Sequence, residues 1–281
     1  MMKTVLKILL AITLLFFAAF YAGSFFTREY VKDNVEALTN IGISNPETFS
    51  HRELNEFPLN VQKYLKLSVE EGIEIPQFVK IKLKGHFKTD LKSEFKKLTA
   101  EEYFSVNKPG FVWNAKISAS TFYWIRAVET YLGGSGSILI KLLSSINITE
   151  LTGNEIDISS LIRYYSEAVL FPTVFLDNNI SWTYKNPKHS SAVFRIDDMK
   201  FKMDFFFNRR GLIERVESSD RFRTTKTGFQ KSVYAVNYSD YKKIDGFLIP
   251  TKIEVQWKLP ANDFTYGIFK IVSIDYKNPT L

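Results

Sequence analysis

The sequence predicts an α+β domain that is mainly β: a curved antiparallel sheet or open half-barrel, covered by one or two helices and preceded by a transmembrane helix. Two observations predict the sheet. Apolar and polar residues alternate with period two over many short segments after residue 76, and turn sequences separate these segments. No rhythm of strand–helix–strand units occurs, so a parallel sheet is not expected. The third observation is an uncharged apolar run near the N-terminus.

The apolar run covers residues 8–26 (ILLAITLLFFAAFYAGSFF), 19 residues without a charge. As a helix it is about 28 Å long, close to the hydrocarbon thickness of a bilayer. An uncleaved anchor and a cleaved signal peptide are both compatible with it, and Ala22-Gly23-Ser24 could serve as the cleavage site of a signal peptide. We favour the anchor, because the apolar run continues beyond that site.

Lys3 and Lys7 precede the run, so the positive-inside rule leaves the N-terminus in the cytoplasm and exports the main domain. Two of the 37 Lys and Arg residues lie before residue 27 and none of the 30 acids does, so the exported part carries 35 basic against 30 acidic side chains. That excess, spread over about 255 residues, is too dilute for nucleic-acid binding. The expected organisation is a transmembrane anchor or signal segment over 1–26, a linker or stalk over 27–54, and an extracytoplasmic β-rich domain over 55–281.

After the stalk, the pattern predicts a short helix that begins at Pro58 and a first strand that begins near Pro76. The polar positions of that strand are cationic: Lys80, Lys82, Lys84, His86 and Lys88. This stripe is either a surface for anionic head groups or the solvated outer face of the sheet, and we favour the outer face. The other expected strands cover residues 98–106, 111–118, 120–131, 179–185, 191–196, 199–207, 212–219, 229–239, 247–259 and 265–276.

One helix interrupts the strands, at residues 157–170 (DISSLIRYYSEAVL), where Asp157 or Ser159 can cap an amphipathic pattern. Arg163 and Glu167 lie four residues apart on it and can pair. Two roles are open for the pair. It is an exposed structural pair, which we favour, or it lies at a cavity mouth where Arg163 binds a carboxylate or phosphate head group.

The sequence carries no signature of a known catalytic or metal centre. The chain has no cysteine and three histidines, and no two histidines have the spacing of metal ligands. The segment Gly133-Gly134-Ser135-Gly136 lacks the Lys-Ser/Thr end of a phosphate-binding loop, so we interpret it as a turn or hinge. The adjacent acids Glu101 and Glu102 are expected to be surface charges. We predict no cofactor, no metal and no catalytic residue.

Aromatic residues are frequent along the strands and beside the helix. Filling of an ordinary core explains many of them. A curved sheet with only one covering helix, however, often leaves an apolar interior that large side chains line without filling, and such a cavity accepts an acyl chain or similar ligand. The candidate ligand-binding residues are Trp113, Tyr131, Arg163, Glu167, Phe171 and Trp257.

Several motifs follow one another along the chain. They are Pro109-Gly110-Phe111-Val112-Trp113, Arg163-Tyr164-Tyr165 with Glu167-Ala168, Phe171-Pro172, and Asp245-Gly246-Phe247 with Ile249-Pro250. Over residues 55–276 this order resembles a bacterial family of uncharacterised proteins whose members often carry N-terminal transmembrane segments, and the resemblance implies no activity. The Asp-Gly-x-x-Ile-Pro hairpin also resembles one in periplasmic lipoprotein carriers of the LolA/LolB type. That resemblance implies a half-barrel whose helices cap a hydrophobic cavity.

We therefore predict a membrane-tethered extracytoplasmic protein that binds a lipid-like or other hydrophobic ligand, with the membrane as its other partner. Two other classes stay open. One is a cell-envelope enzyme that uses Arg163 and Glu167 with a nearby tyrosine, and the other is a structural or assembly partner in the envelope.

Overall fold

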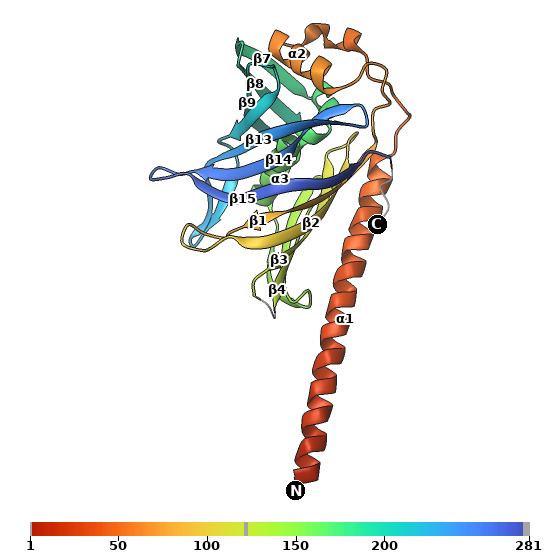
Figure 1. The fold of residues 1–281 in the computed structure, drawn as a ribbon, viewed down its shortest axis with the longest axis vertical. Helices are drawn as coiled ribbons and strands as arrows, with labels where there is room; N and C mark the ends of the chain where they lie inside the picture. The colour runs from red at the N-terminus through yellow and green to blue at the C-terminus, as the bar shows by residue number, and fades with distance from the viewer. Residues whose placement is uncertain (1, 121–122, 278–281) are drawn as a thin grey trace.

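A computed structural model describes residues 2–120 and 123–277 of the chain. One long N-terminal helix stands against a large curved sheet, and shorter helices lie on the inner side and at one end of that sheet (Figure 1).

In the described residues, thirteen strands form a single antiparallel sheet. They are β1 (Phe78–Phe87), β2 (Lys96–Ser105), β3 (Gly110–Ser118), β4 (Trp124–Leu132), β5 (Ser135–Leu142), β6 (Ile146–Leu151), β7 (Ile180–Asn186), β8 (His189–Ile196), β9 (Met199–Phe207), β10 (Ile213–Ser218), β13 (Val233–Ile244), β14 (Phe247–Lys258) and β15 (Phe264–Asp275). Their spatial order is β6-β5-β4-β3-β2-β1-β15-β14-β13-β10-β9-β8-β7, so β6 and β7 are edges and the sheet stays open. A separate hairpin, β11 (Phe222–Thr225) and β12 (Gly228–Lys231), lies between β10 and β13 in the sequence. The predicted open, curved antiparallel sheet is confirmed.

The helix α3 (Asn154–Glu167) crosses the concave face of the sheet because the chain must pass from one edge to the other. It follows the edge strand β6, and the short helices η2 (Ala168–Leu170) and η3 (Pro172–Leu176) lead on to the opposite edge strand, β7. The helix approaches β5 closely: a Cβ atom on Gly136 would lie 2.7 Å from Ser160 Oγ. The helices η1 (His51–Glu56) and α2 (Leu59–Ser68) lie at one end of the sheet, where α2 contacts β8, β14 and η3. The expected covering helices are therefore present.

The first helix, α1 (Met2–Gly42), contains the apolar run and much of the expected stalk without a break. By length and hydropathy its first part is sufficient to cross a membrane. Its C-terminal part packs on the convex face of the sheet, where Val31, Val35 and Leu38 are buried against Tyr103 and Val112. The spacing of four and three residues brings these apolar side chains to one side of the helix. In Figure 1 the N-terminal end of α1 extends well beyond the sheet.

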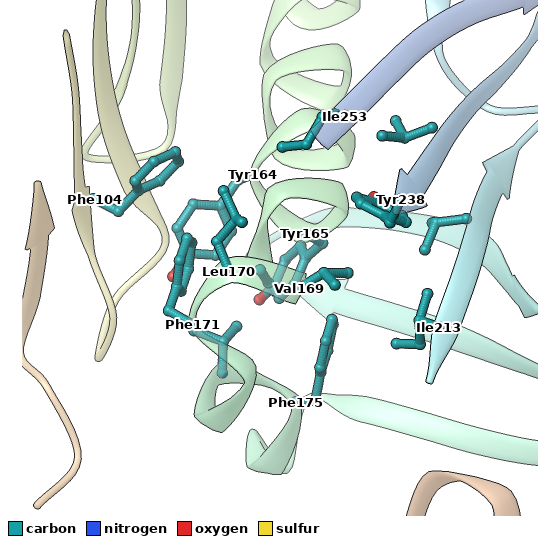
Figure 2. Packing of buried hydrophobic residues seen from close by; sticks show 14 of the residues in the cluster. Phe104, Tyr164, Tyr165, Val169, Leu170, Phe171, Phe175, Ile213, Tyr238 and Ile253 are labelled. Atoms are coloured by element: carbon teal, nitrogen blue, oxygen red, sulfur yellow. The ribbon is translucent and has the colours of Figure 1, made fainter. Parts of the chain in front are cut away.

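The core around the C-terminal end of α3 is a network of aromatic rings. The ring centroids of Phe104 and Phe171 lie 4.8 Å apart, and those of Tyr165 and Phe194 lie 4.4 Å apart. Figure 2 shows Tyr164 and Tyr165 on α3 directed into this cluster. Rings from the helix and from the sheet meet here, and they leave this part of the interior filled.

The cationic residues of β1 lie on the convex face, opposite the core. Lys82 Nζ lies 3.2 Å from Glu101 Oε1 on the neighbouring strand, and Lys80 Nζ lies 5.3 Å from the centre of the Tyr103 ring. On the same strand, Val79 and Ile81 point the other way and are buried. Over β1 the period-two pattern therefore separates the two faces as the sequence predicted, but the expectation that Lys88 continues the outer stripe is wrong, because Lys88 follows the strand and lines the concave side.

Three strands, β5, β6 and β11, were not expected from the sequence. In β5 the residues Ile138 and Ile140 line the concave side, whereas Leu139 is buried in the cluster that contains α1. Because both faces of this strand are covered, its central residues are apolar without alternation, and the period-two signal is lost. The expected strand over 229–239 also divides, into β12 and β13.

The boundaries of two further elements differ from the prediction. The helix expected from residue 157 begins at Asn154; its N-cap is Gly153, and no side chain caps it. The expected cap Asp157 instead accepts a hydrogen bond from the backbone N of Gly136, at 2.6 Å. The strand expected over 120–131 begins at Trp124, and residues 121–122 lie outside the described residues. The glycine-rich segment forms the turn between β4 and β5, with positive φ at Gly133 and Gly134.

Candidate ligand-binding cavity

A cavity of about 600 Å³ lies between α3 and the concave face of the sheet. Its walls come from α3, from strands on both sides of β1, from the β1–β2 loop and from the hairpin strand β11. Most of the lining is apolar: Phe87, Trp113, Ile117, Ala119, Ile125, Ala127, Ile138, Ile140, Ile156, Phe222, Val255, Trp257, Phe264 and Phe269. Volume and lining are in the range of sites that bind small apolar molecules.

Between α3 and the strands β4 and β5, small and aliphatic side chains border the cavity. On the concave side of β4, Ile125 and Ala127 face the space under α3, and Ile138 and Ile140 of β5 lie beside them. The facing residues of α3 include Ile156 and Ser159, which are also short. These side chains do not span the distance between helix and sheet, so an unfilled volume remains.

The face of α3 that lines the cavity changes from apolar to charged along the helix. Ile156, Ser159, Arg163 and Glu167 all line it, and their spacing of three or four residues places them on one helical face. The first part of this face is apolar or small and the last part is charged. The cavity therefore has apolar walls and a charged region beside the C-terminal end of α3.

Arg163 is 9% exposed and is held by three glutamates, so the pair with Glu167 forms as predicted but the expectation that it is exposed is wrong. Its Nη1 lies 2.5 Å from Glu129 Oε2 on β4, its Nη2 lies 2.5 Å from Glu102 Oε1 on β2, and its Nε lies 3.1 Å from Glu167 Oε1. The guanidinium also lies 4.6 Å from the centre of the Trp113 ring. Every nitrogen of the guanidinium thus has a carboxylate partner, and the residue ties α3 to two strands of the sheet.

Three carboxylates around one guanidinium give the cluster more negative than positive charge. Burial, and next the charge of Glu167, raise the pKa of Glu102 well above its ordinary value. Burial also raises the pKa of Glu167, although the neighbouring Arg163 opposes this. Both side chains therefore hold a proton at higher pH than a glutamate in water does. Glu167 Oε2 is buried and has no hydrogen-bond partner among the described residues.

The structure brings four of the six predicted site residues to one cavity. Trp113, Arg163, Glu167 and Trp257 line it, from β3, α3 and β14. The other two lie in the filled core and outside the lining: Tyr131 is 1% exposed, and Phe171 packs on Phe104.

The expectation that Glu102 is a surface charge is wrong, because its exposed fraction is 2%. Neighbours on the strand do point to opposite faces: Glu101 faces outward to Lys82, and Glu102 faces inward to Arg163. The signal was present in the sequence, since period two puts Glu102 on the same face as Ala100. Glu129 could have been found in the same way.

Arg221 also lines the cavity and was not identified from the sequence. It lies between β10 and β11, in a connection without periodicity, so only the tertiary structure places it there. Among the described residues, no group of three or more His, Asp or Glu side chains is arranged to hold a metal ion.

Residues 47–269 match the model of a family of unknown function, DUF6544. This confirms the expected relationship to an uncharacterised family. No curated protein matches the chain.

Several solved structures are similar in fold at low sequence identity. A LolA superfamily protein from Nitrosomonas europaea is 8% identical, with a TM-score of 0.43 and coverage of 78% of this chain and 92% of that chain. An outer membrane lipoprotein-sorting protein domain from Vibrio parahaemolyticus is 8% identical, with a TM-score of 0.38 and coverage of 72% and 86%. A DUF1329 family protein from Desulfovibrio piger is 10% identical, with a TM-score of 0.40 and coverage of 72% and 86%. Likenesses of this size carry no argument about what the chain binds.

Proposed function

This chain belongs to the family of unknown function DUF6544, and from its geometry we propose that it is a membrane-tethered extracytoplasmic protein that binds a lipid-like or other hydrophobic ligand under α3. The observation that carries the proposal is the cavity of about 600 Å³ with its largely apolar lining. Burial of aliphatic chain contributes about 0.8 kcal/mol per methylene. An alkyl chain of several methylenes can therefore bind in the cavity without a catalytic group or a charged contact.

The tether is supported by α1. Its uncharged run over 8–26 follows Lys3 and Lys7, an arrangement that leaves the N-terminus in the cytoplasm and the sheet outside it. The same helix continues without a break to Gly42 and packs on the sheet, so an unbroken helix would join the anchor to the domain.

The contacts of α1 favour a cavity that lies near the bilayer. The centroid of the Phe20 ring lies 6.3 Å from that of Trp124, and Ser145 Oγ donates to Phe20 O at 2.7 Å. Trp124 begins β4, and the next residue, Ile125, lines the cavity. The apolar part of α1 therefore leaves the sheet at the end that holds the cavity. A bilayer around this part of the helix would lie near the cavity.

The geometry adds no support for an envelope enzyme that uses Arg163 and Glu167. The nitrogens of Arg163 already have carboxylate partners, so its N–H donors are not available to bind a substrate. We therefore assign the Arg163 cluster the structural role of fastening α3 over the sheet.

The test compares the lipid that copurifies with the full chain and with a variant whose cavity is filled. Ala127→Phe places a ring in the cavity, and Thr99→Phe adds the same ring at an exposed position on the outer face of β2. Mass spectrometry of the extracted lipid should show at least about a tenfold loss for Ala127→Phe, because the apolar contact area is removed. Thr99→Phe should retain the wild-type content. Equal lipid content in all three proteins would contradict the proposal.

A further inference from the structure

The β11–β12 hairpin lies outside the main sheet and forms one wall of the cavity. Phe222 N donates a hydrogen bond to Ser159 Oγ at 3.1 Å, which holds the start of β11 against α3. Arg221, Phe222, Arg223 and Thr224 all line the cavity. A connection that carries no strand signal in the sequence thus supplies two arginines to the candidate site.

Arg221 is buried, with an exposed fraction of 9%, and is surrounded by aromatic side chains. Its guanidinium lies 4.0 Å from the centre of the Tyr234 ring and 5.6 Å from that of Trp257. Its Nη1 donates to the hydroxyl of Tyr266 at 3.3 Å. Its Nε is buried without a hydrogen-bond partner, and within the described part of the chain no carboxylate forms an ion pair with it.

The two buried arginines of the cavity therefore differ. Arg163 has three carboxylate partners, whereas Arg221 has ring faces and one hydroxyl. Contacts with rings offset part of the cost of burying a guanidinium, but an unpaired buried charge stays expensive. Arg223 lies two residues further on, in β11, and also lines the cavity, where its Nε is buried without a partner among the described residues.

We propose that Arg221, assisted by Arg223, binds the carboxylate or phosphate head group of an amphipathic ligand whose chain lies in the apolar part of the cavity. The inference rests on the proposed function, and it adds the chemical class of the ligand. A planar guanidinium with free donors matches such a head group in geometry and in charge. Exclusion of water by the rings strengthens the interaction.

The charges that line the cavity favour an anion. The charged lining residues are Lys88, Lys96, Arg163, Arg221 and Arg223 against Glu94, Glu129 and Glu167, five cations against three carboxylates. Glu167 Oε2 suits a cationic head group instead, because it is a buried acceptor without a partner among the described residues. The experiment therefore includes an amine.

The test uses the full chain in phosphatidylcholine nanodiscs and three photo-crosslinkable probes with the same C16 alkyl chain: a carboxylic acid, an alcohol and an amine. A fourth crosslinkable probe is an alkyl phosphate with the same chain. Free acetate serves as a competitor without a chain. Mass spectrometry gives the yield of crosslinks to cavity residues. The variants are Arg221→Gln, Arg221→Lys and the exposed control Arg210→Gln, which removes the same charge elsewhere.

The acid and the phosphate should label the wild-type cavity more strongly than the alcohol. Arg221→Gln should lower labelling by the acid about tenfold or more, because it removes a charge-assisted hydrogen bond. Labelling by the alcohol should change less than about twofold, because the alcohol makes no charged contact. Arg221→Lys should retain part of the acid labelling, and Arg210→Gln all of it.

Three outcomes would overturn the inference, and they differ from failure of the proposed function. Equal labelling by acid and alcohol in wild type and Arg221→Gln would show a cavity that ignores the head group. Stronger labelling by the amine than by the acid would indicate that the ligand has a cationic head group, which Glu167 binds. Competition by acetate at the concentration of the acid would indicate a site for a free anion. Absence of cavity labelling by every probe would instead contradict the proposed function itself.

Discussion

The concave face of the sheet has a filled half and a hollow half, and α3 spans both. In the filled half, rings from the helices meet rings from the sheet. The ring centroids of Phe175 and Phe205 lie 5.4 Å apart, and those of Tyr165 and Phe194 lie 4.4 Å apart. In the hollow half, Ile156 and Ser159 of the same helix face Ala127 and its aliphatic neighbours. The backbone architecture is continuous across the boundary, so the side chains distinguish a core from a binding cavity: rings such as Trp113 and Trp257 border the empty volume without filling it.

The two halves also differ in which buried polar atoms stay without a hydrogen-bond partner. In the filled half, Tyr164 donates to Ser105 O at 2.7 Å and Tyr238 donates to Ser166 O at 2.6 Å, whereas the neutral hydroxyls of Tyr131 and Tyr165 have no partner among the described residues. The hollow half keeps Arg221 Nε and Glu167 Oε2 without partners among the described residues. The unpaired atoms of the hollow half belong to ionisable groups that border an empty volume, where a ligand can supply the missing contacts.

The largest expected effect separates the two halves by removing a ring from each. Phe171→Ala in the filled half should lower the free energy of unfolding by about 3–5 kcal/mol, because Phe104 and Tyr164 lose their neighbour. Phe269→Ala should cost less than about half of that, because Phe269 is half-buried and borders the cavity. Urea unfolding of the full chain, followed by tryptophan fluorescence, measures both. Equal losses would show that the two halves are packed alike.

The next effect comes from adding a ring to each half. Ala192→Phe on β8 overfills a position that is fully buried, and it should cost about 1–3 kcal/mol of unfolding free energy. Ala127→Phe puts the same ring into the cavity and should change the unfolding free energy by less than about 1 kcal/mol. Thermal unfolding of the two variants beside wild type tests this. A larger loss for Ala127→Phe would mean that the cavity is too narrow for a ring.

The smallest effect is a pH dependence that arises from the charged region of the cavity. Because burial, with the charge of Glu167, raises the pKa of Glu102 in the folded chain, the folded state binds more protons above pH 4.5 than the unfolded state. The free energy of unfolding should therefore fall as the pH rises from about 4.5 toward the raised pKa, with a slope of at most about 1.4 kcal/mol per pH unit for this proton. Glu102→Gln should reduce that slope in urea titrations between pH 5 and 8, and what remains comes from Glu167, whose pKa burial also raises.

Glu101→Gln provides the matched control on the adjacent, outward-facing residue. Burial opposes the shift, but hydrogen bonds from Tyr103 and Lys82 lower the pKa of Glu101 below its ordinary value. The stabilisation from this group is complete above its unfolded pKa and is lost only as the pH falls through the folded one. Its removal should leave the slope between pH 5 and 8 unchanged. A slope that persists in Glu102→Gln and disappears in Glu101→Gln would reverse the assignment.

Particular elements show how far the sequence reached. The alternation in 78–87 predicted both the strand and its two faces, and the apolar stripe of 157–170 predicted the helix within three residues of its start. The strand β5 was not predicted, because helices lie over both of its faces and its sequence therefore does not alternate. Among the site residues, aromatic and charged positions near the helix were found at Trp113, Arg163 and Trp257, whereas Arg221 in an aperiodic connection had no sequence signal.

The sequence by itself determined the mainly β architecture, the long apolar N-terminal segment and the family, because hydrophobic periodicity and motif order are properties of neighbouring residues. Only the tertiary structure decided which rings fill the interior and which border an empty volume. It also gave Arg163 three carboxylate partners from separate elements, while Arg221 received none among the described residues. These outcomes depend on distances between residues far apart in the chain, and such distances exist only once α3 has crossed from one edge of the sheet to the other.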